Sequence, residues 1–184
     1  MITFREAKLS DVSVIAKLHA KNWQENYRGV FSDTYLDTEV ISDRLAVWKR
    51  RLTKPPNNQH IILAEEGEEL LGFSCAYFNE HATYGTYLDN LHVSSKAKGK
   101  GIGSKLMLQL SEAIISRNFH GLYLWVIDNN ASAIHFYNNL GGMLLDKEEA
   151  NDIGDVIFIK MRYVWSNLGV LQSRINQKLK RHER

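Results

Sequence analysis

The sequence predicts a single domain of mixed α+β architecture, and three observations carry this prediction. The chain has 184 residues, a typical length for one domain with a full-sized core. Apolar residues recur at helical spacing near its start, β-rich runs joined by short turns follow, and strands then alternate with helices. This order favours a mostly antiparallel central sheet flanked by helices, in an α+β or α/β arrangement.

The N-terminal part is expected to contain one strand and two helices. Residues 2–7 form the strand, and Gly29 ends the first helix. The apolar stripe of that helix comprises Val12, Ile15, Leu18, His19 and Trp23. The second helix has a predicted buried stripe of Ile41, Leu45, Trp48 and Leu52. Pro55 and Pro56 then break the chain.

The middle of the chain is expected to form the sheet. The apolar runs at 60–65 and 70–78 read as a hairpin, and 86–93 as a third strand that leads into a glycine-rich stretch. The helix that follows has an apolar face of Leu106, Leu110, Ala113 and Ile114. The remaining elements are a strand at 122–127, a short helix at 131–140, and closing strands at 143–145 and 155–163.

Residues 164–184 are expected to form an amphipathic helical extension to a domain of residues 1–163. One helical face carries Trp165, Leu168, Leu171, Ile175 and Leu179. The end of the segment is basic, with Lys178, Lys180, Arg181 and Arg184. We expect this helix to dock on its own domain or to form a homodimer, with contact to an acidic partner as an alternative.

Composition excludes several classes of function. The formal net charge is only +2, so neither nucleic acid nor a membrane surface is expected as the main partner. The chain has one cysteine, Cys75, which gives no disulfide framework and no cysteine-based zinc site, and no metal is expected. The N-terminus turns polar at once, without the apolar core of a signal peptide. A cytoplasmic enzyme or binding protein is therefore the expectation.

The most informative feature is a strand followed by three alternating glycines and a helix start. Gly99, Gly101 and Gly103 leave no Cβ in the way, so successive backbone N–H groups can turn toward one point. The N-terminus of the helix adds about half a positive charge, which suits a phosphate group. Four lysines surround the turn: Lys96, Lys98, Lys100 and Lys105. The alternative is a solvated loop whose glycines serve only to turn the chain.

Spacing excludes two familiar phosphate-binding motifs. No string has the four residues that a P-loop requires between its first glycine and Gly-Lys-Ser/Thr. A dinucleotide fingerprint requires Gly-x-Gly-x-x-Gly, whereas the third glycine here comes one residue early.

Two stretches of the sequence resemble the GNAT acetyltransferase superfamily. Residues 91–106 are similar to its acetyl-coenzyme A signature, a strand followed by Gln/Arg-x-x-Gly-x-Gly/Ala and a helix. Lys98 departs from the signature at its first position, where it keeps the charge but lacks the planar fork of arginine. Residues 130–142 are similar to the family segment Asn-x-x-Ala-x-x-Phe-Tyr-x-x-x-Gly. The two matches occur in the family's order and on the expected elements.

This resemblance implies a cofactor site. In such a fold the strand that ends at Val93 and the strand at 122–127 splay apart, and the pantetheine arm of acetyl-CoA pairs with backbone groups of Leu91, His92 and Val93. The pyrophosphate would be held by Lys98, Gly99, Lys100, Gly101, Ile102, Gly103 and Ser104. Asn130 and Ala133 would lie on the other side of the arm, although Asn130 could instead cap its helix. Tyr137 stands where the family often has a general acid, and it would also contact the cofactor.

The acceptor side is less defined by the pattern. Strand alternation predicts Tyr87, Asp89, Leu91 and Val93 on one face. Some family members have a glutamate in the place of Tyr87, so Asp89 becomes the candidate for the base or for a residue that binds a cationic acceptor; it could equally be a solvated strand residue. The aromatic residues Trp23, Tyr27 and Trp125 are candidates for the walls of the acceptor pocket, with core packing as the alternative for Trp125.

The function predicted from these motifs is the direct transfer of an acetyl group from acetyl-CoA to a primary amine of a small molecule or peptide, in a ternary complex. The alternative is a domain that binds acetyl-CoA as a sensor without catalysis. A third hypothesis is the binding of another phosphorylated nucleotide.

Overall fold

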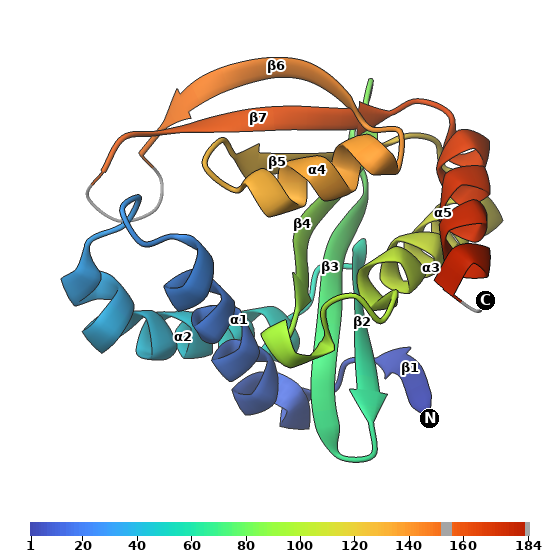
Figure 1. Cartoon of the computed structure of the whole chain (residues 1–184). Helices are drawn as coiled ribbons and strands as arrows, with labels where there is room; N and C mark the ends of the chain where they lie inside the picture. Colours follow the sequence, from blue (N-terminus) through green and yellow to red (C-terminus); the bar gives the residue numbers. More distant parts are fainter. Residues whose placement is uncertain (152–155, 183–184) are drawn as a thin grey trace.

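In the computed structural model, which describes residues 1–151 and 156–182, seven strands form one sheet in the order β1-β2-β3-β4-β5-β7-β6 (Figure 1). The strands are β1 (Ile2–Glu6), β2 (Gln59–Glu66), β3 (Glu69–His81), β4 (Gly85–Val93), β5 (Leu122–Ile127), β6 (Met143–Ala150) and β7 (Phe158–Trp165). The helices are α1 (Val12–Asn26), α2 (Val40–Thr53), α3 (Ile102–Ser116), α4 (Ala131–Asn139) and α5 (Leu168–His182). The predicted mixed α+β fold with a mostly antiparallel sheet is confirmed. The predicted start of the last strand, at 155, lies outside the described residues.

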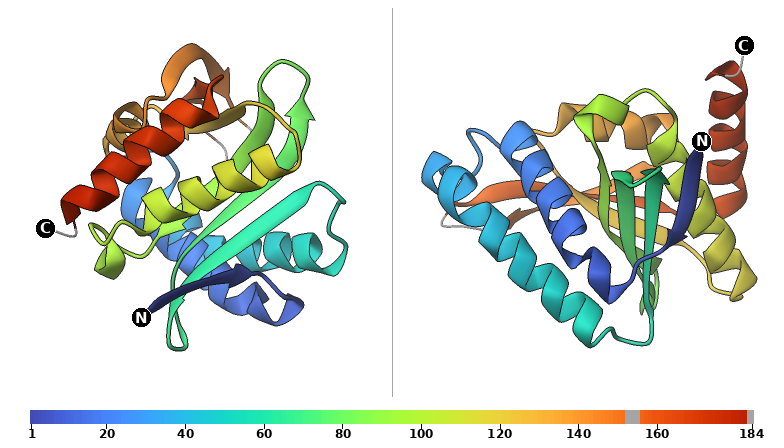
Figure 2. Two further views of the ribbon diagram at one scale, coloured as in Figure 1. Left: turned by 90° about the vertical axis from the view of Figure 1, so that its right-hand side faces the viewer. Right: turned by 90° about the horizontal axis from the view of Figure 1, so that it is seen from below.

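Helices cover both faces of the sheet. Helices α1 and α2 lie on one face, and α3 and α5 lie on the other (Figure 2). Two apolar clusters correspond to these layers. On the α1–α2 side, Ile15, Trp48 and Phe73 pack together, and on the α3–α5 side, Leu110 and Leu171 share a cluster with strand residues.

The centre of the sheet contains a wedge. Strands β4 and β5 are parallel and pair only over Thr86–Leu88 with Leu122–Leu124, whereas the other strand pairs are antiparallel. Two glycines hold the strands together at the closed end. A Cβ added to Gly85 would lie 1.7 Å from the carbonyl oxygen of His120, and one added to Gly121 would lie 2.6 Å from that of Tyr84. Beyond Leu88 the facing edges diverge, which confirms the predicted splay.

A bulge in β4 changes which side chains share a face. Cys75 of β3 pairs with Asn90, but the next residue, Ala76, pairs with Leu88, so Asp89 is an extra residue. Because one extra residue reverses the alternation, the prediction of a common face for residues 87, 89, 91 and 93 is wrong. Asp89 faces Arg51 of α2, whereas Leu91 and Val93 pack in the cluster on the α3 side.

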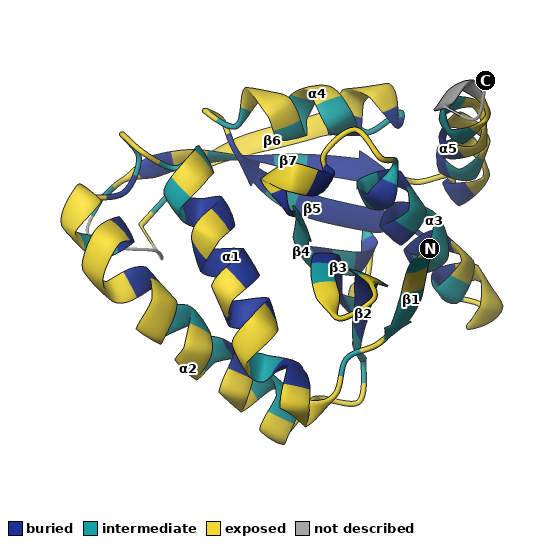
Figure 3. Ribbon diagram, turned by 60° about the horizontal axis from the view of Figure 1, so that its bottom comes forward, coloured by how far each residue is buried: buried dark blue, intermediate teal, exposed yellow. Residues whose placement is uncertain are grey.

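Helix α2 also presents a different face from the one predicted. Trp48 is fully buried, but Ile41 and Leu45 are 51% and 40% exposed, and exposed residues mark much of the outer surface of this helix (Figure 3). The predicted stripe is therefore wrong for these two residues. The face of α2 that looks toward the sheet instead carries arginines, because it borders a cavity.

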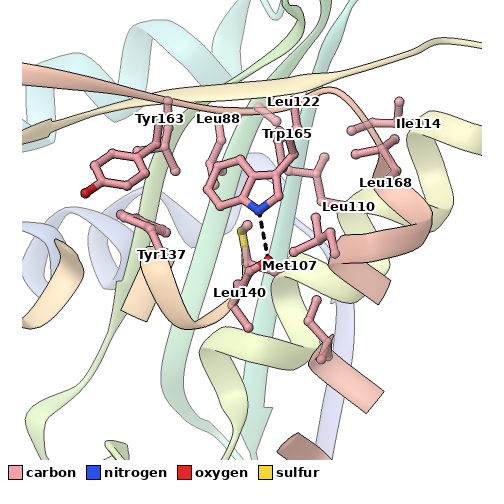
Figure 4. Packing of buried hydrophobic residues seen from close by; sticks show 14 of the residues in the cluster. Leu88, Met107, Leu110, Ile114, Leu122, Tyr137, Leu140, Tyr163, Trp165 and Leu168 are labelled. Carbon is pink, nitrogen blue, oxygen red and sulfur yellow. Dashed lines mark hydrogen bonds between the residues drawn. The ribbon is translucent and has the colours of Figure 1, made fainter. Parts of the chain in front are cut away.

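Helix α5 belongs to the main core. Leu171 and Ile175 have no exposed surface, and Leu168 is 7% exposed. The preceding strand residue, Trp165, is enclosed between α3 and the end of α4, and its Nε1–H donates a hydrogen bond of 3.0 Å to the carbonyl oxygen of Leu140 (Figure 4). The apolar face expected for the C-terminal extension thus packs on the chain's own sheet.

Candidate active site

A cavity of about 580 Å³ occupies the open end of the wedge between β4 and β5. Its walls come from these two strands, the loop before α3, the start of α4, and the faces of α1 and α2 that look toward the sheet. Since the pairing of β4 with β5 stops at Leu88, backbone groups of the following β4 residues are free on this side to pair with an extended ligand.

The glycine loop forms one end of the cavity. Gly99 and Gly101 adopt φ angles of +83° and +76°, which favour glycine, and Gly101 is the N-cap of α3 without a side-chain cap. The N–H groups of the first helical turn therefore remain for a ligand. The Oγ atom of Ser104 is buried without a hydrogen-bond partner and belongs to a residue that lines the cavity. These features fit a phosphate-bearing ligand.

Most of the predicted cofactor residues line this cavity, and one does not. The lining includes Leu91, His92, Val93, Lys98, Gly99, Gly101, Ile102, Gly103, Ser104, Asn130, Ala133 and Tyr137. Lys100 is exposed and lies outside the lining. Its backbone N–H donates to the carbonyl oxygen of Ala97 at 3.4 Å, within the turn itself.

Asn130 and Tyr137 face the wedge from α4. The Oδ1 atom of Asn130 accepts a hydrogen bond of 3.1 Å from the backbone N–H of Ala133, so this side chain caps α4. Tyr137 is 8% exposed. Burial, with a smaller contribution from Tyr27, raises the pKa of the Tyr137 phenol well above its usual value. The phenol is therefore protonated at neutral pH, as a proton donor must be.

Asp89 reaches the cavity as part of an ion pair. Its Oδ2 atom lies 2.6 Å from Nη1 of Arg51, and the two side chains are only 19% and 21% exposed. The same Arg51 nitrogen donates to Oδ1 of Asn90 at 2.8 Å. The carboxylate is therefore held in place on the α2 side of the cavity and is not a solvated strand residue.

The three aromatic candidates for the acceptor pocket line the cavity, but cations of the protein already cover two of their rings. Trp23 is 6% exposed, and the guanidinium of Arg44 lies 4.3 Å from its ring centre. Trp125 lines the cavity and is not part of the core; Arg162 and Lys160 lie 4.4 and 4.8 Å from its ring. Tyr27 packs edge-on against Trp23, with ring centres 5.8 Å apart.

Residues 19–142 match the model of the acetyltransferase (GNAT) family. The chain belongs to the GNAT acetyltransferase family. The matched part contains the wedge, the glycine loop and Tyr137, and the predicted enzyme class is confirmed.

Relatives of known sequence agree with this assignment. The uncharacterized N-acetyltransferase YuaI of Bacillus subtilis is 25% identical over 182 residues, which cover 96% of this chain and 100% of the relative. The thialysine N-epsilon-acetyltransferase of Bos taurus is 30% identical over 125 residues, 60% of this chain and 74% of the relative.

Solved GNAT structures share the fold. The PaiA N-acetyltransferase of Thermoplasma acidophilum, determined with coenzyme A, has a TM-score of 0.71 at 18% identity and covers 90% of this chain and 99% of its own. YncA of Salmonella typhimurium, determined with acetyl-CoA, has a TM-score of 0.63 at 17% identity and covers 90% and 94%.

Two groups of lining residues in this GNAT domain were absent from the sequence prediction. Lys178 of α5 borders the cavity, with its Nζ 4.9 Å from the ring centre of Phe136. The next residue, Leu179, packs against the glycine loop, since a Cβ on Gly101 would lie 3.0 Å from it. The other group is Arg44, Arg50 and Arg51 of α2. No sequence motif marks either group, although the spacing of the arginines along one helical face is a usable signal.

Two further results concern the described residues only. None of their helices combines the length and the apolar character needed to cross a bilayer. No cluster of three or more histidine, cysteine, aspartate or glutamate side chains among them is arranged to hold a metal ion.

Proposed function

We propose that this protein transfers the acetyl group of acetyl-CoA to a primary amine, by direct attack of the amine while both substrates are bound. The observation that carries the proposal is the wedge between β4 and β5, which has an uncapped glycine loop at one end and the phenol of Tyr137 inside it. In this proposal the wedge holds the long, phosphate-bearing thioester, and the second substrate enters from the α2 side.

The residues around the wedge fit the parts of acetyl-CoA. The N–H groups at the start of α3, with Gly99, Gly101 and Gly103, would bind the pyrophosphate, and Ser104 Oγ would gain the partner that it lacks. The unpaired edge of β4 from Leu91 to Val93 would hydrogen-bond to the amides of the pantetheine arm. Nδ2 of Asn130 would donate to the arm from α4.

Lys178 extends this cofactor site to the C-terminal helix. Its ammonium group lies over Phe136, beside the glycine loop. A lysine at that place supplies a positive charge for a phosphate group, as does Lys98 on the loop itself.

Tyr137 is the proposed acid. The thioester supplies an activated acyl group. As the bond from the amine nitrogen to the acetyl carbon forms and the carbon–sulfur bond breaks, the leaving thiolate requires a proton. The buried phenol donates it and regains a proton from solvent. Cys75 does not line the cavity, and burial raises the pKa of its thiol to about 12, which supports transfer without an acyl-enzyme.

The amine must lose a proton before it can attack. A lysine-like ammonium has a pKa of about 10.4, so its deprotonation at neutral pH costs roughly 4–5 kcal/mol. The arginines of α2 lower this cost, because neighbouring positive charges disfavour the ammonium form. Asp89, which Arg51 holds at the edge of the cavity, is the proposed proton acceptor, acting through a water molecule.

Assembly and acceptor identity remain predictions. The bovine relative is named for thialysine, and an amine at the end of a flexible chain would reach from the α2 side into the wedge. Homodimer formation and a cytoplasmic location stay predictions. For the first, the apolar face of α5 is already used within the chain, since Leu171 and Ile175 are fully buried.

The decisive experiment measures thiol release from acetyl-CoA against a panel of amines, for the wild type, Tyr137→Phe and Tyr84→Phe. Tyr84 does not line the cavity and controls for the loss of a hydroxyl. We expect Tyr137→Phe to lower kcat by about a hundredfold with little change in acetyl-CoA affinity. Tight binding of acetyl-CoA without thiol release for any amine would favour a sensor, and absence of binding would contradict the assignment of the glycine loop.

A further inference from the structure

The acceptor side of the cavity is bordered by a row of arginines. Arg44, Val47 and Arg51 lie at spacings of three and four residues on one face of α2, and Arg50 also lines the cavity. Asp89 is the one acidic residue among the cavity-lining residues that the structure describes. This wall therefore carries a net positive charge.

Two carboxylates pair with Arg44 and Arg51, and neither of them pairs with Arg50. Asp89 forms an ion pair with Arg51, in which Oδ2 lies 2.6 Å from Nη1. Asp43 pairs with Nη2 of Arg44 at 2.8 Å, but it also accepts a hydrogen bond from the Tyr35 hydroxyl. The Nε–H of Arg44 is buried and has no hydrogen-bond partner. Within residues 1–151 and 156–182, Arg50 forms no ion pair.

A cationic acceptor does not fit these surroundings. The Trp23 ring, which could bind an ammonium group, is already stacked by Arg44, and Trp125 is covered by Arg162 and Lys160. A second positive charge would be repelled by the arginines at short range. A buried guanidinium Nε–H without an acceptor, by contrast, matches the oxygen of an anionic group.

The cofactor does not account for the arginines. The features that fit its phosphates are the start of α3 and Lys178 of α5, which lie on one face of the sheet. Helix α2 lies on the opposite face, beside α1 (Figure 2). The arginines therefore face the side from which the acceptor would enter.

We propose that the acceptor is an amine that also carries an anionic oxygen group, a carboxylate or a phosphate, which Arg44 and Arg50 bind while Arg51 holds Asp89. The inference rests on the proposed acetyl transfer and adds the class of its acceptor. The anionic group anchors the acceptor on α2, and its amine end points toward the wedge. The same positive wall keeps the bound amine in its reactive, neutral form.

The test compares acceptors that differ only by the anionic group. L-lysine is paired with cadaverine, which is lysine without its carboxylate, and phosphoethanolamine is paired with ethanolamine. We expect kcat/KM to be at least about tenfold higher for the anionic member of one pair, mainly through KM. The pair that shows the difference identifies the anionic group as carboxylate or phosphate. Equal or higher kcat/KM for both cadaverine and ethanolamine, which lack the anionic group, would overturn the inference while leaving acetyl transfer intact.

Variants connect the preference to the arginines. Arg50 is exposed, so Arg50→Gln is expected to fold, and Arg44→Lys keeps the charge of Arg44 but removes its Nε–H. Each should lower the ratio of kcat/KM between the anionic amine and its partner by about fivefold or more. Lys49→Gln removes the same charge from α2 outside the cavity and is the matched control. A ratio that falls equally in the control would contradict binding by the arginines.

A binding measurement separates this inference from the proposed function. Calorimetry on the protein saturated with coenzyme A compares the products Nε-acetyl-lysine and N-acetylcadaverine, without any turnover. Tighter binding of the carboxylate product, weakened in Arg50→Gln, would support the anion site even if no thiol release were detected. Equal affinities within this pair, and also between N-acetyl-phosphoethanolamine and N-acetylethanolamine, would overturn it even in an active enzyme.

Discussion

His92 borders the cavity as an uncharged imidazole. Burial, and secondarily the charge of Arg44, lowers its pKa to about 3. The ring of His19 lies 4.4 Å away, and burial lowers the pKa of this residue as well. Its Nδ1 accepts a hydrogen bond of 3.0 Å from Nε1–H of Trp48, which places its proton on Nε2. Two neutral histidines thus lie between the buried core and the arginines, where imidazolium charges would be repelled.

Acid should therefore destabilise the protein through His92. Below about pH 6.5 the unfolded chain binds a proton at this residue, whereas the folded chain does so only near pH 3, so the free energy of unfolding falls as the pH falls. The loss is at most about 1.4 kcal/mol per pH unit for this one group, and it vanishes above about pH 7. Urea unfolding between about pH 7.5 and about pH 5.5 should give a shallower pH dependence for His92→Gln than for the wild type.

His135→Gln is the control for this measurement, because His135 is exposed on α4. Its pH dependence should match that of the wild type. Identical slopes for the wild type and His92→Gln would show that the burial of His92 does not contribute to acid sensitivity.

The positions of site residues that depend on neighbouring residues in the sequence were predictable. The positions of residues that tertiary contacts bring to the site were not. The glycines at 99, 101 and 103 form the predicted turn because alternating glycines and a helix start are encoded within a few positions. The bulge at Asp89 arises from the pairing of β4 with β3. Simple strand alternation does not include this bulge, so it placed Asp89 on the same face as Leu91 and Val93. Lys178 comes from an element about 75 positions beyond the glycine loop, and no local pattern connects the two.

At the level of elements, α2 shows why apolar periodicity alone does not predict the buried face of a helix that borders a cavity. The predicted stripe included Ile41 and Leu45 because they are apolar, yet the buried side of the helix holds Trp48 together with arginines. A helix that borders a polar cavity does not need an apolar face along its whole length. The strands at 60–65, 70–78, 86–93 and 122–127 lie close to their predicted positions, because their apolar runs are buried in the sheet. Strand β6 runs beyond the predicted 143–145 to Ala150, and its side chains are mostly exposed, so no apolar run marks its full length.

Helix α5 provides the element-scale prediction. Lys178→Gln should weaken acetyl-CoA binding by about three- to tenfold, because it removes one partly exposed positive charge beside the proposed phosphate site. The effect should shrink as salt is raised. The affinity for acetyl-CoA is measured by calorimetry at low and high ionic strength, with Lys180→Gln as the control on the exposed side of the same helix. An equal loss for both variants would indicate a nonspecific charge effect.

At the scale of the whole molecule, one apolar cluster joins α3, α5, the end of α4 and the inner strands. It contains Leu110 of α3, Leu140 directly after α4, Trp165 of β7 and Leu171 of α5. Figure 4 shows the first three of these together. The division between residues 1–163 and 164–184 expected from sequence stays a prediction. Because α5 shares its core with the sheet, we expect the two parts to unfold together.

Leu171→Ala tests this coupling. Leu171 has no exposed surface, so its truncation should lower the free energy of unfolding by about 2–5 kcal/mol. Val170, its neighbour, is 45% exposed, and Val170→Ala should change stability by less than about 0.5 kcal/mol. Denaturation followed by circular dichroism and by tryptophan fluorescence should give one coincident transition. Two separated transitions, with Leu171→Ala moving only one, would instead indicate an independent C-terminal unit.

The late position of α5 in the chain has a consequence for biosynthesis. The cluster on this side of the sheet includes residues from Ala76 to Ile175, so a growing chain exposes the apolar faces of β4, β5 and α3 until α5 has been made. The wall formed by α1 and α2 against β2 and β3 uses only earlier residues and can assemble first. Domains tend to fold as units during translation, and an incomplete domain leaves aggregation-prone apolar surface exposed. Nascent chains stalled just before α5 should therefore be the form most dependent on chaperones.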